Sequence, residues 1–385
     1  MCIRDSTEGN PFYVEQMLLY LQENDLLHAV TDQVDGVMPG DVYIPTDVRA
    51  LLTARLDRLP PAVKNVVQNA AVLGREFEVP ILFEMMAKDP ELERKLETAA
   101  DESIWLAIDE SHYLFQHALL RDAAYDMQLH SRLRQLHKLA AEASEKQLER
   151  DLSLESRYPA IAYHFDKAEE RDQARSYYGQ AGEHAKNSYH NEEAITYFSR
   201  ALDLTDVVDL DSRYKFLCGR ETIYQWQGRR EQQQRDLQEL ERLLKRHPDD
   251  LKQANLTLRQ SSYALVMGDY DSAIAAAKSS LFFASRTGDV EAQAKAHHRH
   301  GRTYWQQGIA TEAEHHLLRA LSLAHDSQNR EIEAESLYDL GMVYLFKANY
   351  DEARSYLDEA YRVYTELDDE RGVVQCKNLF GVIAY

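Results

Sequence analysis

The sequence predicts an all-α fold with at most a small β-element, in which a helical domain precedes a long helical solenoid. Three observations predict it. Only 15 glycines and nine prolines occur in 385 residues, about half of their usual share of roughly 12%. Apolar residues recur at helical spacing along most of the chain. The C-terminal half also repeats itself with a period of about 40, which is typical of stacked helical hairpins.

The composition excludes several classes of protein. Lys and Arg number 44 against 65 Asp and Glu, and the net charge of −21 argues against binding nucleic acid through a general basic field. No run of about 18 apolar residues is present to span a membrane, and residues 1–6 lack the apolar core of a secretory signal. Cys2, Cys218 and Cys376 are odd in number and far apart, so they predict neither a disulfide nor a metal site. We therefore expect a cytoplasmic protein without a membrane partner.

The N-terminal part of the chain, 1–170, predicts a separate domain. Residues 1–6 fit no helical pattern and are interpreted as a non-native scar. Asn10 and Pro11 are typical of a helix start, and a loop follows at 34–43. The elements expected beyond it are a helix capped by Thr46 that runs to about Leu59, helices from Pro60-Pro61 to Leu73 and from Val79-Pro80 to about Met85, a helix over Leu92–Ile108, a strand over His112–Gln116, and helices over Ala118–Tyr125 and Arg132–Glu149. Helices followed by a strand are consistent with a winged-helix-like domain over 36–130, with connecting helices over 131–170.

The repeat is visible at several markers that share one period. Five aligned segments end at Ala194, Gln233, Ala273, Ala313 and Ala353, so that successive ends differ in number by 39, 40, 40 and 40. Small residues for close helix approach recur at Gly301, Gly341 and Gly381. Four positions after the small residue that opens the second helix, a large apolar residue is expected to be buried, at Phe198, Leu237, Leu317 or Leu357. The second repeat has Glu221 and Gln233 at its two small positions, so we expect looser packing there.

These markers resemble the tetratricopeptide repeat in its longer version. The resemblance covers 171–385, about five and a half repeats, and the last repeat stops inside its first helix, so we expect the chain to be cut there. It implies an α-solenoid whose first helices line a concave groove for a protein or peptide partner. Counting from the close-packing glycines places these residues in the groove: Cys218, Thr222, Trp226, His298, Arg302, Trp305, Tyr338, Met342, Leu345, Asn378 and Val382. The alternative is that Trp305 and Tyr338 only pack between neighbouring hairpins.

The N-terminal part carries a second resemblance. Thr7–Phe12, Ile44–Leu59, Ala70–Phe77 and Phe115–Tyr125 are similar to segments of bacterial STAND/AAA-type signalling ATPases. These are predicted ATPases found with adenylate or guanylate cyclase, kinase or transcription-regulator domains. The resemblance implies that 7–35 is the residual end of an NTPase module and that a winged helix follows.

The same resemblance implies a nucleotide site in an intact parent protein. Gly9 and Pro11 would lie at the adenine, and His117 would reach the ADP phosphate; the alternatives are a plain helix start at Pro11 and a packing or capping histidine at 117. ATP or ADP and Mg²⁺ would be the parent's ligands, with nucleotide-dependent self-association possible there. No Gly-Lys pair of a P-loop occurs in the chain, so we expect that it binds no cofactor and is not itself an enzyme.

Two further motifs could suggest a metal site or DNA binding, but neither function is expected. The histidines at 297, 298, 300, 315 and 316 suggest a metal site, but His297 and His300 fall on the packing face, so we expect packing and no metal. A recognition helix over Pro90–Glu110 would hold seven acidic and two basic residues, which disfavours DNA. The function expected is therefore a regulatory segment of a STAND-type NTPase; the alternative is a tetratricopeptide scaffold without nucleotide coupling.

Overall fold

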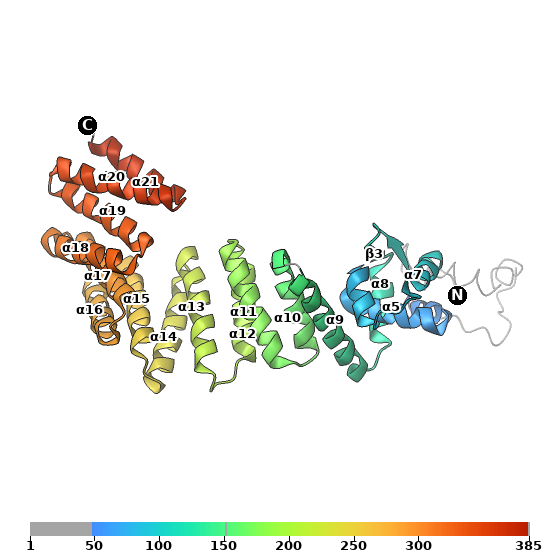
Figure 1. Cartoon of the computed structure of the whole chain (residues 1–385). Coiled ribbons are helices and arrows are strands. Elements are labelled where there is room, and N and C mark those ends of the chain that lie inside the picture. Colours follow the sequence, from blue (N-terminus) through green and yellow to red (C-terminus); the bar gives the residue numbers. More distant parts are fainter. Residues whose placement is uncertain (1–47, 151, 384–385) are drawn as a thin grey trace, which may run out of the picture. The chain divides into compact units, whose positions relative to one another are not determined.

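The computed structural model describes residues 48–150 and 152–383 (Figure 1). These residues divide between Asp206 and Val207 into two compact units, and each is presented by itself. The helix expected at Pro11, the cap at Thr46, the boundary at residue 35 and the nucleotide residues Gly9 and Pro11 lie outside the described residues.

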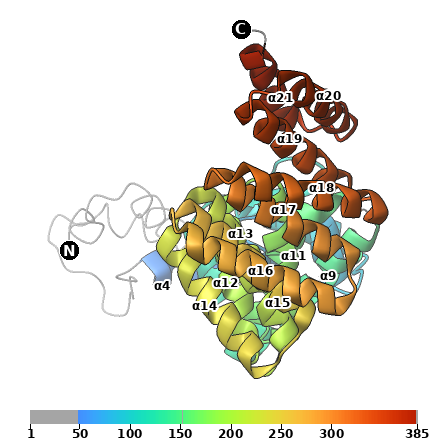
Figure 2. The same ribbon diagram turned by 90° about the vertical axis from the view of Figure 1, so that its left-hand side faces the viewer.

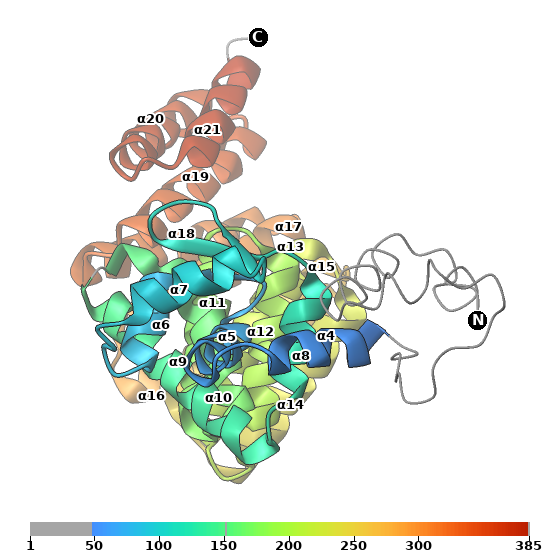
Figure 3. The same cartoon turned by 90° about the vertical axis from the view of Figure 1, so that its right-hand side faces the viewer.

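The first unit begins with a domain of helices and three short strands. Its elements are α4 (Val48–Asp57), α5 (Pro61–Leu73), β1 (Glu76–Glu78), α6 (Val79–Met85), α7 (Leu92–Asp101), β2 (Trp105–Ala107), β3 (His112–Phe115) and α8 (Ala118–Asp126). The strands form one antiparallel sheet in the order β1-β3-β2, and α8 packs on both α4 and α5 (Figure 3). This order of helices and strands is that of a winged helix, as expected.

Aromatic residues from all three strands form the centre of this domain. Phe77, Trp105 and Phe115 are buried, with Trp105 edge-on to the other two rings at 5.1 and 5.4 Å. The indole Nε1 of Trp105 donates to the carbonyl of Leu96 at 3.0 Å, which ties the sheet to α7. Leu82 and Leu120 complete the core from α6 and α8.

The helix expected over Leu92–Ile108 is wrong at its C-terminal end. α7 stops at Asp101, because Ser103 takes a positive φ of 53° that a continuing helix cannot accommodate. The chain then enters β2, in which Trp105 is buried, as is Ile104 just before the strand. The recognition helix expected over Pro90–Glu110 is shortened accordingly, and its basic residues are paired within the chain: Lys95 with Asp89 at 2.6 Å and Arg94 with Glu91 at 3.3 Å.

The rest of the first unit is helical. It contains α9 (His130–Arg150), a 3₁₀ turn (Leu152–Arg157), α10 (Tyr158–Lys167), α11 (Arg171–Asn187) and α12 (Asn191–Leu204). Each α-helix packs on the next one along the chain, which is the neighbour-to-neighbour contact of a solenoid. The expected helix over Arg132–Glu149 corresponds to α9 within two residues at its start and one at its end.

The second unit is a regular array of helical hairpins. Its first helices are α13 (Leu210–Gln227), α15 (Asp250–Val266), α17 (Val290–Gln306), α19 (Arg330–Phe346) and α21 (Glu370–Ile383). The second helices are α14 (Arg230–Arg246), α16 (Tyr270–Thr287), α18 (Ala310–Ser327) and α20 (Tyr350–Glu366). Successive members of each series begin one repeat period apart, and each helix packs on the next, as α20 does between α19 and α21 (Figure 2). The predicted period is confirmed.

Capping residues set the helix bounds. The side chains of Asp209, Asp249, Asp289 and Asn329 each accept a hydrogen bond from the backbone N–H three residues on, at the start of α13, α15, α17 and α19. This satisfies one of the N–H groups that a helix start leaves without a partner. In the part of the chain that the structure describes, no helix is long and apolar enough to cross a membrane.

The second repeat packs more loosely than the later ones, as expected, because α13 and α14 have fewer residues in contact than the two helices of each later hairpin. Glu221 and Gln233 are fully buried, and Gln233 Nε2 donates to Glu221 Oε1 at 2.8 Å. The other carboxylate oxygen of Glu221 accepts from Arg259 of α15. Polar side chains therefore fill the place of the small residues by satisfying one another, as buried polar groups must.

Candidate partner-binding groove

Four of the predicted groove residues lie together in one cavity. Arg302 and Trp305 of α17 and Tyr338 and Met342 of α19 line a hollow of about 430 Å³. The N-terminal part of α21 supplies the third wall. All three helices are first helices of their hairpins, which is the face that the repeat resemblance assigns to a partner. This hollow is called the α17–α19–α21 cavity below.

An aromatic pair lies at this cavity. The ring of Trp305 meets that of Phe346 edge-on, with the centroids 5.4 Å apart. Trp305 is half-buried, while Phe346, at the end of α19, is 64% exposed. Leu345 is half-buried beside it in sequence and does not line the cavity. Trp305 therefore packs against the neighbouring hairpin and also lines the cavity.

His298 lies beneath the cavity instead of on its surface. The side chain is 3% exposed, and its Nε2 donates to Asp339 Oδ2 at 2.9 Å. Its Nδ1 lies 3.5 Å from Glu335 Oε2. Burial raises the pKa of Asp339, but the hydrogen bond from His298 and the nearby charges outweigh it, so the carboxyl pKa lies below its usual value. His298 thus orients two carboxylates that line the cavity and is not itself accessible to a partner.

The remaining predicted groove residues are elsewhere. Asn378 and Val382 are exposed on α21 but do not line the cavity. Cys218 and Thr222 lie on α13. Arg259 of α15 contacts the backbone carbonyl of Cys218 at 3.3 Å and the hydroxyl of Thr222 at 2.9 Å, so its side chain covers this part of the face. Trp226, also on α13, is 53% exposed.

Sequence reasoning missed several residues of the cavity. Glu335 lies one helical turn before Tyr338 and Asp339 on α19, and the i, i+3, i+4 rule would have added it. Gln375 lies one repeat period after Glu335 and follows from the repeat. Asp369, Arg371 and Gly372 come from the start of α21, and Tyr364 comes from α20, a second helix. The count along first helices from the close-packing glycines contains no signal for these four.

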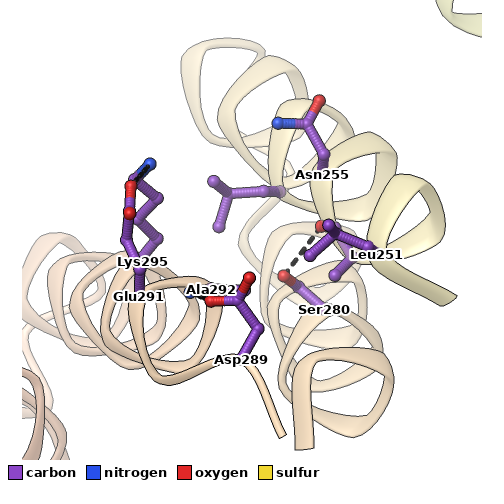
Figure 4. Close-up of a pocket in the computed structure, with 9 residues that line it drawn as sticks. Leu251, Asn255, Ser280, Asp289, Glu291, Ala292 and Lys295 are labelled. Carbon is purple, nitrogen blue, oxygen red and sulfur yellow. Dashed lines mark hydrogen bonds and ion pairs between the residues drawn. The ribbon is translucent and has the colours of Figure 1, made fainter. Parts of the chain in front are cut away.

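A second, smaller cavity lies between α15, α16 and α17. It has a volume of about 230 Å³, and Leu251 and Asn255 line it from α15 while Glu291 and Lys295 line it from α17 (Figure 4). Its polar groups are engaged within the chain: Ser280 Oγ donates to the carbonyl of Ala254 at 2.9 Å, and Glu291 pairs with Lys295. This cavity offers a ligand fewer free polar groups than the larger one.

His117 lies at the junction of β3 and α8. It follows β3 and occupies the position before the first residue of α8. Its side chain makes no capping hydrogen bond, whereas its backbone carbonyl accepts from the N–H of Leu120 at 3.0 Å. The side chain is half-buried. Capping by the imidazole is therefore excluded as its role, and packing or contact with a phosphate remain.

The histidine cluster is a stack of rings inside one hairpin. His297 Nδ1 of α17 lies 3.0 Å from His316 Nδ1 of α18, and the rings of His300 and His316 are 3.9 Å apart. Burial lowers the pKa of His297 to about 4 and that of His300 to about 3. Within the described ranges, no three His, Cys, Asp or Glu side chains are grouped so that they could hold a metal ion. The cluster is a packing feature of the α17–α18 hairpin.

Comparison with known proteins agrees with the repeat architecture. The tetratricopeptide repeat profile matches residues 292–366, which run from α17 to α20. A comparison with the curated proteins gave no significant match.

Several solved structures resemble this helical chain at low identity. One is a STAND protein with a tetratricopeptide repeat sensor from Pyrococcus horikoshii, 14% identical with a TM-score of 0.47; the match covers 97% of this chain and 60% of that protein, so this chain spans less than two thirds of its length. The apo form of RapI is 19% identical over 54% of this chain and 77% of RapI, with a TM-score of 0.48. A tetratricopeptide protein of Thermus thermophilus is 20% identical over 53% of this chain and 98% of its own length, with a TM-score of 0.42. By its hairpins, its regular period and its repeat match, this chain is a helical protein that contains tetratricopeptide repeats.

Proposed function

We propose that the second unit binds a protein or peptide partner in the α17–α19–α21 cavity. The observation that carries the proposal is that Arg302 and Trp305 of α17 and Tyr338 and Met342 of α19, two consecutive first helices, line one hollow that α21 completes. Aromatic residues, Met and Arg are enriched at protein interfaces, and Trp, Tyr and Arg supply most of the binding energy. A cavity of this kind suits side chains of an extended or helical peptide.

The same proposal extends to the whole chain as a regulatory segment of a STAND-type NTPase. The winged-helix domain would report the state of the nucleotide, and the repeats would sense the partner. Support comes from the motifs at 44–59, 70–77 and 115–125 and from the order of winged helix and repeats along the chain. Docking of the winged helix on an ATPase core would be the two-state element, with ADP and ATP favouring opposite states.

ATP hydrolysis belongs to the parent protein in this proposal. The chain contains no P-loop, so we expect it to supply regulation and no catalysis. The alternative, a scaffold without nucleotide coupling, is distinguished by the coding sequence upstream of residue 7. A Gly-x-x-x-x-Gly-Lys-Ser/Thr motif after a predicted strand would support the regulatory role. An upstream sequence without this motif would support the scaffold function.

Binding to the cavity is tested with peptides selected from a random displayed library on the full chain. Trp305→Ala and Tyr338→Ala should each weaken the selected peptides by about 1–3 kcal/mol. Phe282→Ala is the matched control, because Phe282 is 59% exposed on α16, a second helix outside the cavity. Equal affinities of all three variants and the wild type would refute the assignment of the binding face.

A further inference from the structure

A cavity of about 320 Å³ lies in the first unit, where the winged-helix domain meets the helices that follow it. Phe77 of β1 and Ile81 of α6 line it from the winged-helix domain, and Ser144 of α9 and His164 of α10 line it from the helices. This hollow is called the junction cavity below. Its size suits a small molecule, because pockets for such ligands begin at about 300 Å³.

Three rings form a hydrogen-bonded chain that ends at this cavity. The hydroxyl of Tyr125 lies 2.9 Å from Nε2 of His137, and Nδ1 of His137 lies 2.9 Å from Nδ1 of His164. Tyr125 is half-buried, and the two histidines are 1% and 6% exposed. Burial lowers the pKa of His137 to about 3 and that of His164 to about 4. Both rings are therefore neutral at pH 7, and each has one N–H donor and one acceptor nitrogen.

The hydroxyl at the other end of this chain fixes where the protons lie. In the described chain, the Tyr125 hydroxyl makes its only hydrogen bond to His137 Nε2, and it donates there because a buried tyrosine O–H needs an acceptor. His137 then keeps its proton on Nδ1 and donates to His164. The proton of His164 is left on Nε2, which has no hydrogen-bond partner among residues 48–150 and 152–383. A buried ring thus brings an unused N–H donor to the cavity.

Ser144 brings the complementary group. Its side chain is 4% exposed, and its hydroxyl donates to the carbonyl of Ala140 at 2.8 Å, as a helical serine commonly does. The hydroxyl proton is used in this bond, so the oxygen remains as an acceptor. The cavity therefore offers one donor, the N–H of His164, and one acceptor, the Oγ of Ser144.

The charged side chains of the junction cavity disfavour an anion. Arg157 pairs with Glu78 at 2.7 Å, and His112 pairs with Asp109 at 3.0 Å. Glu76 also lines the cavity, and no ion pair of it occurs in the part of the chain that the structure describes. Negative charge is therefore in slight excess, and a carboxylate or phosphate would be repelled.

We propose that the junction cavity binds a small uncharged molecule that presents an amide on an apolar body. The amide carbonyl would accept from Nε2 of His164, and the amide N–H would donate to Oγ of Ser144. The apolar body would lie on Leu73, Phe77 and Ile81, which line the same cavity. An ammonium group has no acceptor for the histidine N–H. This site belongs to the first unit, so it is independent of the partner binding proposed for the second.

The first part of the test locates the protons. Proton–nitrogen correlation spectra of the full chain with isotope-labelled histidine distinguish a protonated ring nitrogen from an unprotonated one. We expect the proton of His164 on Nε2 and that of His137 on Nδ1, and the spectrum of a His164→Phe variant assigns the signals by their loss. A proton on Nδ1 of His164 would reverse the chain, present an acceptor to the cavity and overturn the inference.

The second part compares probes of one shape and different chemistry. Isovaleramide is the amide, isovalerate the carboxylate, isopentylamine the cation, and methyl isobutyl ketone keeps the carbonyl without the N–H. We expect isovaleramide to bind in the millimolar range and to shift the Nε2 signal of His164. Each lost hydrogen bond should weaken binding about fivefold, so the ketone should bind more weakly than the amide, and isovalerate and isopentylamine more weakly still.

Two variants separate the two hydrogen bonds, with affinities measured by ligand-observed magnetic resonance. Ser144→Ala should weaken isovaleramide about fivefold and leave the ketone unchanged, because the ketone has no N–H to donate. His164→Phe keeps a ring and removes the donor, so it should weaken both probes. The matched control is Ser262→Ala, because Ser262 is 7% exposed, donates to the carbonyl of Leu258 at 2.9 Å and lies in the second unit.

The Ser144→Ala result decides the matter even if His164→Phe proves unstable, since it leaves the histidine chain intact. Circular dichroism confirms that the helices of each variant are formed. An amide that does not shift the His164 signal, a carboxylate or amine that binds as tightly as the amide, or a Ser144→Ala variant that binds the amide like the wild type would each overturn the inference.

Discussion

Gly341 lies so close to Leu357 that a Cβ atom added to the glycine would come within 2.6 Å of the leucine Cγ. The same relationship holds between Gly301 and Leu317, at 2.7 Å. In each case the glycine of a first helix receives the buried leucine of the second helix of its hairpin, so the two helices can touch.

This contact predicts how much one added methyl group destabilises the fold. Gly341→Ala should destabilise the second unit by about 1–3 kcal/mol, the usual cost of overpacking a core. Gly381→Ala is the matched control, because a Cβ there meets nothing within 4 Å among the described residues, and alanine is the better helix former. Thermal unfolding followed by circular dichroism measures both; a Gly341→Ala variant as stable as the wild type would show that the hairpin is looser than described.

The buried pair of Glu221 and Arg259 makes a second prediction. Glu221→Ala leaves the Arg259 guanidinium without its carboxylate in a buried position and should lower the free energy of unfolding by about 3 kcal/mol. The double variant Glu221→Ala/Arg259→Met removes both charges and should recover part of that loss, because the buried amide of Gln233 still lacks the acceptor that Glu221 provides. Urea unfolding of the two variants measures the difference. A double variant less stable than the single one would mean that the pair itself, and not the unpaired charge, provides the stability.

The buried histidines predict that stability falls in mild acid. Burial lowers the pKa of His164 to about 4 and that of His137 to about 3, as it does for His297 and His300. In the unfolded chain, histidine is protonated below its ordinary pKa of about 6.5. In the folded chain, the buried imidazoles stay neutral until about pH 4. The unfolded state therefore binds more protons between these values, and the free energy of unfolding decreases as the pH falls from 6.5 toward 4.

Melting temperatures at pH 8 and pH 5 test this prediction. His300→Phe, which keeps a ring in the stack and removes its titration, should reduce the difference between the two. The exposed His130→Gln should leave the difference unchanged. Melting temperatures that do not change with pH would contradict the burial of these rings.

His117 makes a prediction for an intact parent that carries a P-loop module. His117→Ala should speed the release of ADP and raise basal signalling, because an imidazole at this strand–helix junction can donate to a phosphate oxygen. The release of a fluorescent ADP analogue measures the rate. An unchanged rate would leave only packing as the role of this residue.

Local patterns predicted most of the helical fold for a physical reason. Long amphipathic helices with Asp, Asn or Gly at their ends carry both a helical period and chemical stop signals, and α5 and α6 were predicted at their observed bounds. The strands β1 and β2 have three residues each, too few to show an alternating pattern. The end of α7 depends on Trp105 finding the core of the sheet, a tertiary contact that no local pattern contains.

The cavity, too, could be predicted from the sequence only in part. The repeat period identified the helices and the faces on which Arg302, Trp305, Tyr338 and Met342 lie. It could not show that His298, on the same face, is buried, because that depends on Asp339 of the next first helix.

The most direct test of partner binding is photo-crosslinking from inside the cavity. With p-benzoylphenylalanine in place of Tyr338, irradiation should crosslink a selected peptide to the chain, and excess unlabelled peptide should suppress the product. The same group in place of Phe282 on α16 should give no crosslink, since that face lies outside the cavity. Crosslinking at 338 alone is the predicted result; equal crosslinking at both positions, or a product at 282 only, would contradict the assignment of the groove.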